Sequence, residues 1–543
     1  MQLFPLGSCF AGIMKRIFSY SVKKHGRQAM ADNIKKTIIK GTFILTIAGI
    51  LTKLLGFYNR VFLATTIGAK EIGIYQLIFP VYLIVHCLSC QGFEMGIMKF
   101  VAEEASFGNK RNVWRYLKLS FLFSFSISIF LMIMVLCFHE EIAIHLLKQA
   151  ACSESLFILA FAFPIISIKD CILSYYFAMK KTELPACAQL LEQCVRVTVI
   201  WALATFVLFI SKDASLATIG LVAGEGSALL LTLFAFPKMK KNIDTMVPCS
   251  THPYSGSCKK DVLPVPVVIR RLSGYCIPII GTRLLMNLLS SAESVLIPYT
   301  LAKTLGNEDT ALSLYGTLTG MSMTFILFPS AITNSVAMML LPTISEAKAR
   351  SEKLKVTKAA SLSLHYCLLL GILCTALFLT FGKSLGLTLF HDRTAGEFIF
   401  ILAWLCPFIY ISTTYTSILN GLGRTGITFS NNIITALIRI FAIVALVPYF
   451  SIFGYLLGLL VSYLILALLS IYHVHRETQI HFSAKRSILS PACLALLGVT
   501  FAMITEFLLL KAGLSIGVVT LGISCLVLAG IYCVGCVILR IER

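Results

Sequence analysis

Residues 51–68 read LTKLLGFYNRVFLATTIG and form the second half of a long apolar run, yet they contain Lys53 and Arg60. A run of about 20 apolar residues spans the hydrocarbon core of a bilayer as an α-helix. A cation at the bilayer centre costs about 2.5–3.5 kcal/mol on insertion scales, so it is expected to face water or a partner. The stretch therefore predicts a membrane-spanning helix with one polar side.

The whole chain has the composition of an integral membrane protein. Of its 543 residues, 57% are hydrophobic and 13% are charged, and the mean hydropathy is +0.87. Soluble domains carry about 25% charged residues. The formal net charge is +21, but the basic residues lie mostly between apolar runs, where they set membrane orientation. We therefore expect no nucleic-acid partner.

The cysteine residues of the sequence are interpreted as packing residues and not as a metal or redox site. There are 18 of them, and two CxxC pairs, Cys87/Cys90 and Cys533/Cys536, lie inside predicted membrane helices. Buried cysteine commonly serves as a small apolar packing residue. We interpret both pairs in this way and expect no metal and no cofactor.

Fourteen apolar runs are long enough to cross a bilayer, so the sequence predicts an all-α polytopic membrane protein. If the N-terminus is cytoplasmic, most Lys and Arg residues outside these runs fall in cytoplasmic segments, as the positive-inside rule requires. We therefore expect both termini in the cytoplasm. The runs cover residues 41–67, 74–98, 116–138, 154–179, 186–210, 215–237, 272–299, 314–341, 360–381, 397–419, 427–448, 452–473, 487–509 and 513–538.

An internal repeat divides these runs into two similar halves. ILAFAFPIISIKD at 158 matches ILAWLCPFIYIST at 401, and without a gap Pro164 meets Pro407 and Arg196 meets Arg439. Each half has six crossings, an even number, so the two lobes are expected to be parallel repeats about an axis along the membrane normal. The predicted domains are a basic cytoplasmic N-terminus at 1–40, a first lobe at 41–237, a cytoplasmic linker at 238–271, a second lobe at 272–473 and two extra helices at 474–543.

Polar positions recur in the first helix of each lobe. Lys53 and Arg60 share a helix face, and the aligned seventh run carries Arg283 and Asn287. Together with Arg439 these residues predict a basic cavity between the lobes, and arginine suits a phosphate because its planar fork can form two hydrogen bonds. Other interpretations stay open: Lys53 near a helix end, Arg60 near the outer interface, and a structural role for Arg439.

Acidic residues at depth are candidates for coupling to a cation or proton, or for pairing with the cations. They are Glu94, Asp170 and Glu293. Arg196 follows Glu192 by four residues, which favours a structural ion pair. Lys169 and Asp170 are neighbours and do not share a helix face, so a mutual pair is not expected.

Residues 40–85, KGTFILTIAGILTKLLGFYNRVFLATTIGAKEIGIYQLIFPVYLIV, and LNGLGRT at 419–425 resemble the stage V sporulation protein B family of Gram-positive bacteria. This family is similar to the lipid II flippases and belongs to a superfamily of multidrug, oligosaccharidyl-lipid and polysaccharide exporters. The resemblance implies fourteen helices in two six-helix lobes with two extra helices, and alternating access between the lobes. Asn59-Arg60 stands where lipid II flippases have an Arg-Asp pair, so a different polyprenyl-linked sugar stays open as the substrate.

The sequence and the resemblance together predict a flippase for an undecaprenyl-diphosphate-linked saccharide in the cytoplasmic membrane, with lipid II or a related cell-wall or spore-cortex precursor as the expected cargo. Its partners would be the lipid-linked saccharide, membrane lipids and a cell-wall synthase, and no catalytic residue would be needed. One alternative is a multidrug cation antiporter of the same superfamily. Another is a membrane glycosyltransferase or polymerase, which is disfavoured because the chain has no DxD motif.

Overall fold

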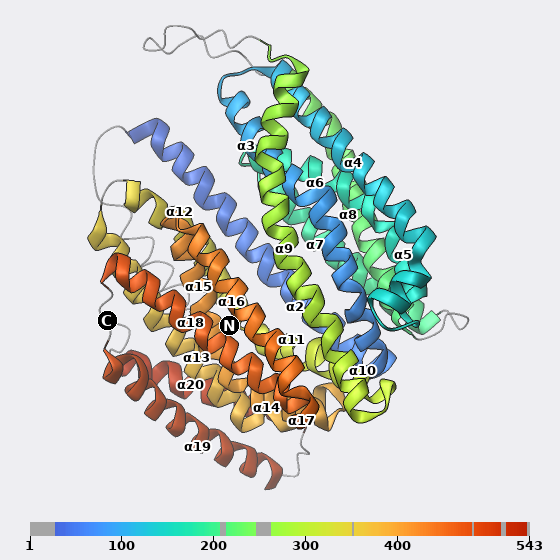
Figure 1. The fold of residues 1–543 in the computed structure, drawn as a ribbon. Coiled ribbons are helices and arrows are strands. Elements are labelled where there is room, and N and C mark those ends of the chain that lie inside the picture. Colours follow the sequence, from blue (N-terminus) through green and yellow to red (C-terminus); the bar gives the residue numbers. More distant parts are fainter. Residues whose placement is uncertain are drawn as a thin grey trace. The chain divides into compact units, whose positions relative to one another are not determined.

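The structure of this chain is a computed structural model that describes residues 28–206, 213–245, 262–349, 352–479, 483–511 and 517–539. Within these ranges the chain is almost entirely helical and contains no strand (Figure 1). The predicted all-α class is therefore confirmed. The start of the predicted N-terminal segment, residues 1–27, and the middle of the predicted linker, residues 246–261, lie outside the described residues.

Among the described residues, 12 helices are long and apolar enough to cross a membrane, or 13 if one bent pair forms a single span. The bent pair is Cys152–Ala160 with Ala162–Ala178, at an angle of 42°. The first candidate, Ile47–Ala105, is 59 residues long and covers two of the predicted runs. Gly68 lies between those runs, and its φ of 80° marks a kink. The protein is thus a multi-pass membrane protein, and the count of fourteen stays a prediction.

The chain forms two compact units, of which the first comprises Lys36–Gly316. The helices that contribute to it are α2 (Gln28–His86), η1 (Cys87–Gln91), α3 (Gly92–Ser106), α4 (Lys110–Glu141), η2 (Ile142–Leu146), α5 (Cys152–Ala160), α6 (Ala162–Ala178), α7 (Glu183–Phe206), α8 (Ala214–Asp244), α9 (Val265–Leu305) and α10 (Glu308–Gly316).

The core of the first unit includes the helix that the repeat assigns to the second lobe. Leu272 and Cys276 of α9 pack in one buried cluster with Ile97 of α3. Gly92 and Gly96 of α3 allow this approach, because a Cβ at Gly92 would lie 2.4 Å from Ile280 and one at Gly96 would lie 2.8 Å from the Cys276 sulfur. Helix α9 therefore packs as part of the first unit, while the predicted lobe division rests on the repeat and stays a prediction.

The second unit contains Thr317–Arg543. Its helices are η3 (Thr317–Ser322), α11 (Met323–Leu327), α12 (Ser330–Ala349), α13 (Lys353–Phe390), α14 (Arg393–Leu402), η4 (Ala403–Leu405), α15 (Cys406–Gly421), α16 (Thr425–Ala445), α17 (Val447–Phe450), α18 (Ile452–Thr478), η5 (Lys485–Leu489), α19 (Ser490–Lys511) and α20 (Val518–Ile538).

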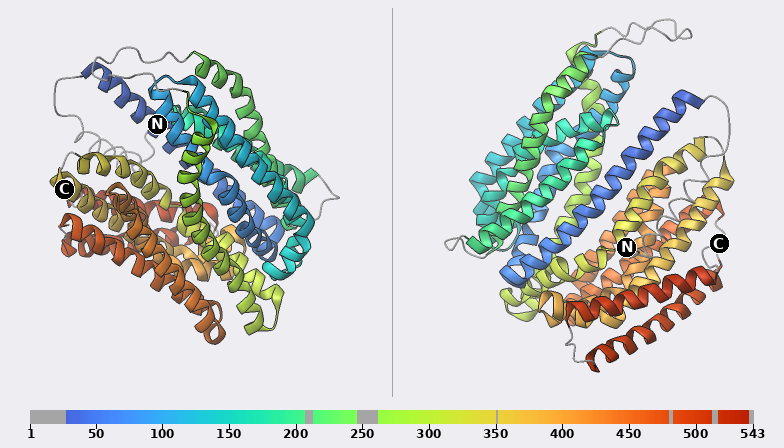
Figure 2. Two further views of the ribbon diagram at one scale, coloured as in Figure 1. Left: turned by 45° about the horizontal axis from the view of Figure 1, so that its top comes forward. Right: turned by 180° about the vertical axis from the view of Figure 1, so that it is seen from behind.

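The two last helices, α19 and α20, are coloured red in Figure 2 and pack beside each other on α13. Leu494 and Leu528 share a buried cluster with Phe381 of α13. The Tyr532 hydroxyl donates a hydrogen bond of 2.9 Å to the Leu369 carbonyl. These contacts attach α19 and α20, the two extra helices of the sequence prediction, to the second unit.

Candidate functional site

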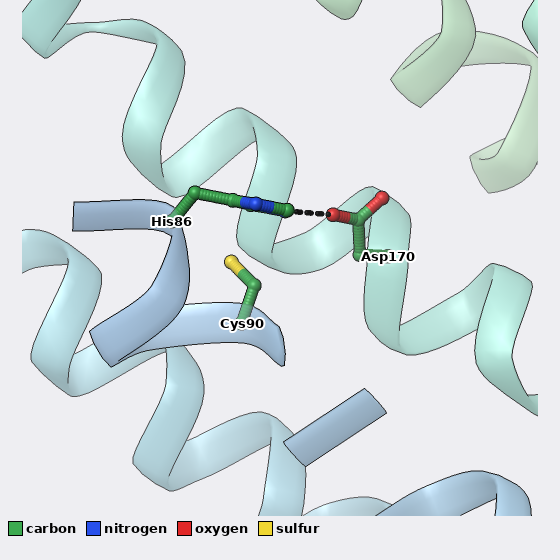
Figure 3. Close-up of side chains that lie close together, drawn as sticks. All are labelled: His86, Cys90 and Asp170. Carbon is green, nitrogen blue, oxygen red and sulfur yellow. Dashed lines mark hydrogen bonds and ion pairs between the residues drawn. The ribbon is translucent and has the colours of Figure 1, made fainter. Parts of the chain in front are cut away.

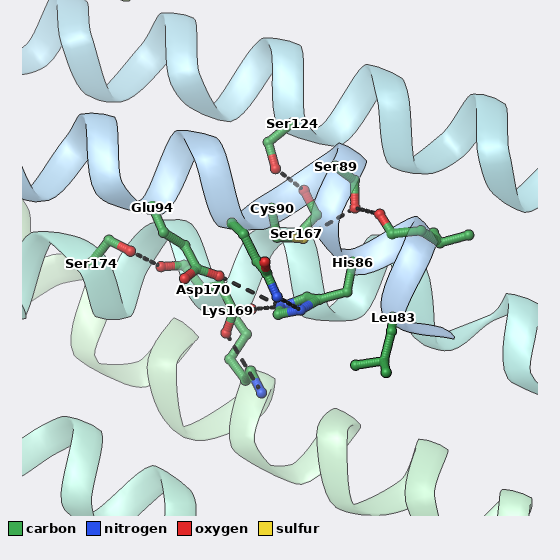
Figure 4. Close-up of polar contacts among 12 residues, drawn as sticks. Leu83, His86, Ser89, Cys90, Glu94, Ser124, Ser167, Lys169, Asp170 and Ser174 are labelled. Carbon is green, nitrogen blue, oxygen red and sulfur yellow. Dashed lines mark hydrogen bonds and ion pairs between the residues drawn. The ribbon is translucent and has the colours of Figure 1, made fainter. Parts of the chain in front are cut away.

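A π-helical turn, η1, interrupts the long helix formed by α2 and α3 in the first unit. Such turns form i→i+5 hydrogen bonds, and single π-turns are frequent at functional sites. His86 directly precedes η1, and Glu94 follows it within the first turn of α3. Figure 4 shows both side chains beside Asp170 of α6.

His86 lies between two carboxylates. Its Nε2 atom is 3.0 Å from Oδ2 of Asp170 and 3.6 Å from Oε1 of Glu94. These side chains are 16–24% exposed, so they are largely shielded from solvent. The structure thus brings together two of the three predicted coupling residues, Glu94 and Asp170.

Lys169 extends this cluster towards α7 and α8. Its Nζ atom is 2.5 Å from Oε2 of Glu225, 3.4 Å from Oε2 of Glu192 and 3.6 Å from Oδ1 of Asp170. The contact with Asp170 differs from the sequence-based expectation. Successive residues on a helix point about 100° apart, but the four-carbon stem of lysine is flexible enough to bring the ammonium group back to its neighbour.

The predicted pair between Arg196 and Glu192 is confirmed, because Nη2 and Oε1 lie 2.6 Å apart. Arg196 is also 3.9 Å from Glu225. Helices α7 and α8 are very close here: a Cβ at Gly224 would lie 2.7 Å from the Glu192 carbonyl oxygen. That approach lets Glu225 reach cations on both α6 and α7.

Carboxylates outnumber the permanent cations in this network. Glu94, Asp170, Glu192 and Glu225 face Lys169 and Arg196, and His86 adds a charge only when it is protonated. An uncompensated charge in a poorly solvated interior is costly. The network is therefore electrostatically suited to a further proton or metal cation.

Two predicted substrate residues of α9 contact the same π-turn region. Nη1 of Arg283 donates to Oε1 of Gln91 at 3.2 Å, and Nε2 of Gln91 lies 3.2 Å from Nδ1 of His86. Nδ2 of Asn287 donates to the Leu83 carbonyl at 3.1 Å. Within the described part of the chain, Arg283 forms no ion pair, in contrast to Lys169 with its three carboxylates.

The other four predicted site residues are Lys53, Arg60, Glu293 and Arg439. Lys53 and Arg60 are half-buried on α2, and Arg60 interacts electrostatically with Arg196. Glu293 is half-buried on α9 and interacts electrostatically with Tyr315. Arg439 is half-buried on α16 of the second unit. The predicted basic cavity between the lobes therefore stays a prediction.

Sequence reasoning missed Glu225 and Gln91 as members of the network. Glu225 lies in the apolar run LVAGEGSALL. An acidic residue in such a run could have indicated a buried partner for a cation. Gln91 carries no charge and gave no such signal. Its role depends on the register of the π-turn, which the sequence does not reveal.

Comparison with known proteins identifies the family. The polysaccharide biosynthesis protein family matches residues 38–348, which is more than half of the chain. Stage V sporulation protein B of Bacillus subtilis (strain 168) is 27% identical over 478 residues, covering 87% of this chain and 90% of that protein.

Two solved structures share the fold. The lipid II flippase MurJ in an inward closed conformation matches with a TM-score of 0.66 and 13% identity, covering 92% of this chain and 99% of that one. An inward-facing multidrug resistance transporter of the MATE family matches with a TM-score of 0.62 and 12% identity, covering 81% and 99%. This likeness concerns the fold of the chain. On the extent of the family match, this chain belongs to the polysaccharide biosynthesis protein family.

Proposed function

We propose that the protein is a flippase that moves an undecaprenyl-diphosphate-linked saccharide across the cytoplasmic membrane by alternating access. Membership of a polysaccharide biosynthesis family and a fold like that of a lipid II flippase support this proposal. The likeness to a sporulation protein supports a peptidoglycan or spore-cortex precursor as the cargo. Both termini would lie in the cytoplasm, and a cell-wall synthase would be the partner that uses the flipped lipid.

The observation that carries the proposal is the contrast between the cations of the first unit. Lys169 and Arg196 are neutralised by nearby carboxylates, so an anionic ligand would have to compete with those carboxylates. Arg283 instead donates to the neutral amide of Gln91. A guanidinium that keeps its charge in a membrane-spanning helix is well suited to a diphosphate, which it can bind through two parallel hydrogen bonds.

The other predicted substrate residues complete the proposal. Asn287 lies four residues after Arg283 and therefore on the same side of α9. Lys53 and Arg60 on α2 and Arg439 on α16 would add positive charge along the path of the head group. The prenyl chain would stay in lipid while the diphosphate and the sugar cross.

We further propose that Glu94 and Asp170 couple transport to a cation. Hydrogen bonds connect Asp170 to the substrate residue Arg283 through His86 and Gln91. Glu94 lies 3.6 Å from the same imidazole. A cation that enters the cluster competes with His86 for Asp170, and any shift of the imidazole is passed to Gln91. Glu293, the third coupling candidate, stays a prediction.

The test is native mass spectrometry of the purified protein with lipid II, an uncharged polyprenol and a cationic drug. We expect selective binding of lipid II, and a loss of about 10-fold or more in Arg283→Gln, since hydrogen bonds to charged groups contribute about 1.5–3 kcal/mol. The matched control is Gln91→Ala, which removes the partner of Arg283 and leaves its charge. Equal lipid II binding by wild type and Arg283→Gln would contradict the proposal.

A multidrug cation antiporter is the second candidate, because the network contains more carboxylates than permanent cations and the fold also matches a multidrug transporter. Binding of the cationic drug alone, reduced by Glu94→Gln and unaffected by Arg283→Gln, would favour this function over the flippase.

A further inference from the structure

We propose that His86, Cys90 and Asp170 form a binding site for one divalent metal ion of the zinc class. One donor atom from each residue lies within 4.8 Å of the other two. Figure 3 shows the Cys90 thiol on the side of the His86–Asp170 pair. The proposal concerns binding by the first unit and does not depend on the transported substrate.

Two donor distances are close to those of a zinc site, and the Cys90 thiol lies within 4.8 Å of the donor atoms of His86 and Asp170. Bonds of about 2.0–2.3 Å in a tetrahedron place neighbouring ligand atoms about 3.3–3.8 Å apart. The His86–Asp170 distance is 3.0 Å and the His86–Glu94 distance is 3.6 Å. Small side-chain rotations would therefore be sufficient to bring three donors onto one ion, with Glu94 available as a fourth.

The fold presents Cys90, and not its neighbour Cys87, to the site. Both thiols are buried, and both belong to η1. The Cys87 sulfur faces α9, where it lies 3.7 Å from the Ile280 carbonyl oxygen. Cys90 lies four residues after His86 on the widened turn, so both face Asp170 of α6. An ion at this site would link η1 to α6.

The set of donors selects the class of metal. Thiolate and imidazole favour Zn²⁺ and similar transition metals, whereas Mg²⁺ and Ca²⁺ prefer oxygen ligands alone. The Cys90 thiolate and the adjacent carboxylates of Asp170 and Glu94 would compensate the charge of a divalent ion. On binding, the Cys90 thiol loses its proton, and the metal replaces the hydrogen bond between His86 and Asp170.

Binding also has a consequence for Gln91. If the metal takes Nε2 of His86, the ring proton resides on Nδ1, which now needs an acceptor. Gln91 points its Nε2 towards Nδ1 and gives its oxygen to Arg283. The amide must turn to present oxygen to His86, as a group that orients a metal-bound histidine does. The Nδ1–H group of a metal-bound His86 and the guanidinium of Arg283 would thus compete for one acceptor, Oε1 of Gln91.

Titration of the purified full chain with Co²⁺, followed by absorbance, tests the site. We expect a thiolate-to-cobalt charge-transfer band that saturates at one equivalent and is abolished by Zn²⁺. Cys87→Ser is the matched control and should keep this band. Cys90→Ser should lose the band and bind Co²⁺ at least about 10-fold more weakly. Removing a residue that only orients a metal ligand already weakens binding by about that factor, so removing a ligand should weaken it at least as much.

A second variant keeps the test decisive if Cys90→Ser fails to fold, as judged by size-exclusion chromatography. Asp170→Asn retains the thiol, so the band should persist while the affinity for Co²⁺ falls. A band that is unchanged in Cys90→Ser, or an affinity that is unchanged in Asp170→Asn, overturns the proposal. Arg283→Gln should bind Co²⁺ more tightly than wild type, and weaker binding would contradict the role given to Gln91.

Discussion

Lys169 shows how a single side chain organises the polar interior of the first unit. Its ammonium group contacts carboxylates from α6, α7 and α8, and the side chain is only 9% exposed. The sequence places a cation at depth but does not reveal these partners, because Glu192 and Glu225 are distant along the chain. The Arg196–Glu192 pair could be predicted, since four residues on one helix define its geometry.

We expect Lys169→Met to destabilise the protein by about 3–5 kcal/mol, because removing one partner leaves a buried charge uncompensated. Thermal unfolding in detergent, compared with wild type, measures this effect. The double variant Lys169→Met/Glu225→Gln removes both charges and should recover part of the loss. A single variant as stable as wild type would show that Lys169 does not compensate these acids.

At the scale of elements, the close contact of α7 and α8 depends on Gly224. We expect Gly224→Ala to destabilise by about 1–3 kcal/mol through overpacking, since its Cβ would lie 2.7 Å from a backbone oxygen of α7. The control is Gly226→Ala in the same helix, where a Cβ meets no atom within 4 Å. The measurement is the free energy of unfolding of both variants in the same detergent. Equal stabilities of the two variants would contradict the close packing of α7 and α8.

The break in the long first candidate span depends on Gly68, which has φ 80° and ψ 173°. Only glycine adopts this conformation readily, and other residues pay about 1–3 kcal/mol. We expect Gly68→Ala to lower stability by that amount even though a Cβ there meets no atom within 4 Å.

Gly49→Ala is the matched control for that change, because Gly49 is helical and equally open. Alanine at a helical glycine stabilises by about 0.5–1 kcal/mol. Opposite signs of the two changes, measured by thermal unfolding, would confirm the strain at Gly68. The same sign for both would contradict it.

Helical content and the approximate limits of most spans could be predicted from runs of apolar residues, because a bilayer demands such runs. The π-turn at Cys87–Gln91 could not, since nothing in CLSCQ distinguishes it from an ordinary helical turn. The packing of α9 on α3 was also missed. It depends on Gly92 and Gly96, whose neighbours in space are not encoded by local spacing.

For the whole molecule, charge distribution predicts which loops face the cytoplasm. Lys148 lies in a predicted outer loop, and Lys180 lies in a predicted inner loop; both are exposed. We expect a membrane-impermeant maleimide to label Lys148→Cys in intact cells and Lys180→Cys only in inverted vesicles, each relative to the parent chain. The reverse pattern would invert the predicted topology.

Both the family and the fold of the whole molecule could be predicted from the sequence. The family match confirms the family, and the structure confirms the fold. The repeat that would relate Arg196 to Arg439 stays a prediction of the sequence. The division into compact units could not be predicted, because it follows the packing of α9 and differs from the lobes that the predicted repeat defines.

The π-turn at Cys87–Gln91 also affects how the sequence of this protein is aligned with the sequences of related proteins. Relative to a regular helix, a turn with i→i+5 bonds holds one surplus residue, as a single-codon insertion would leave. Deleting that residue would rotate everything after it by about 100° and carry Glu94 away from His86. An alignment of this chain with a related protein should therefore allow a one-residue gap at Cys87–Gln91 before the two are judged to share the network.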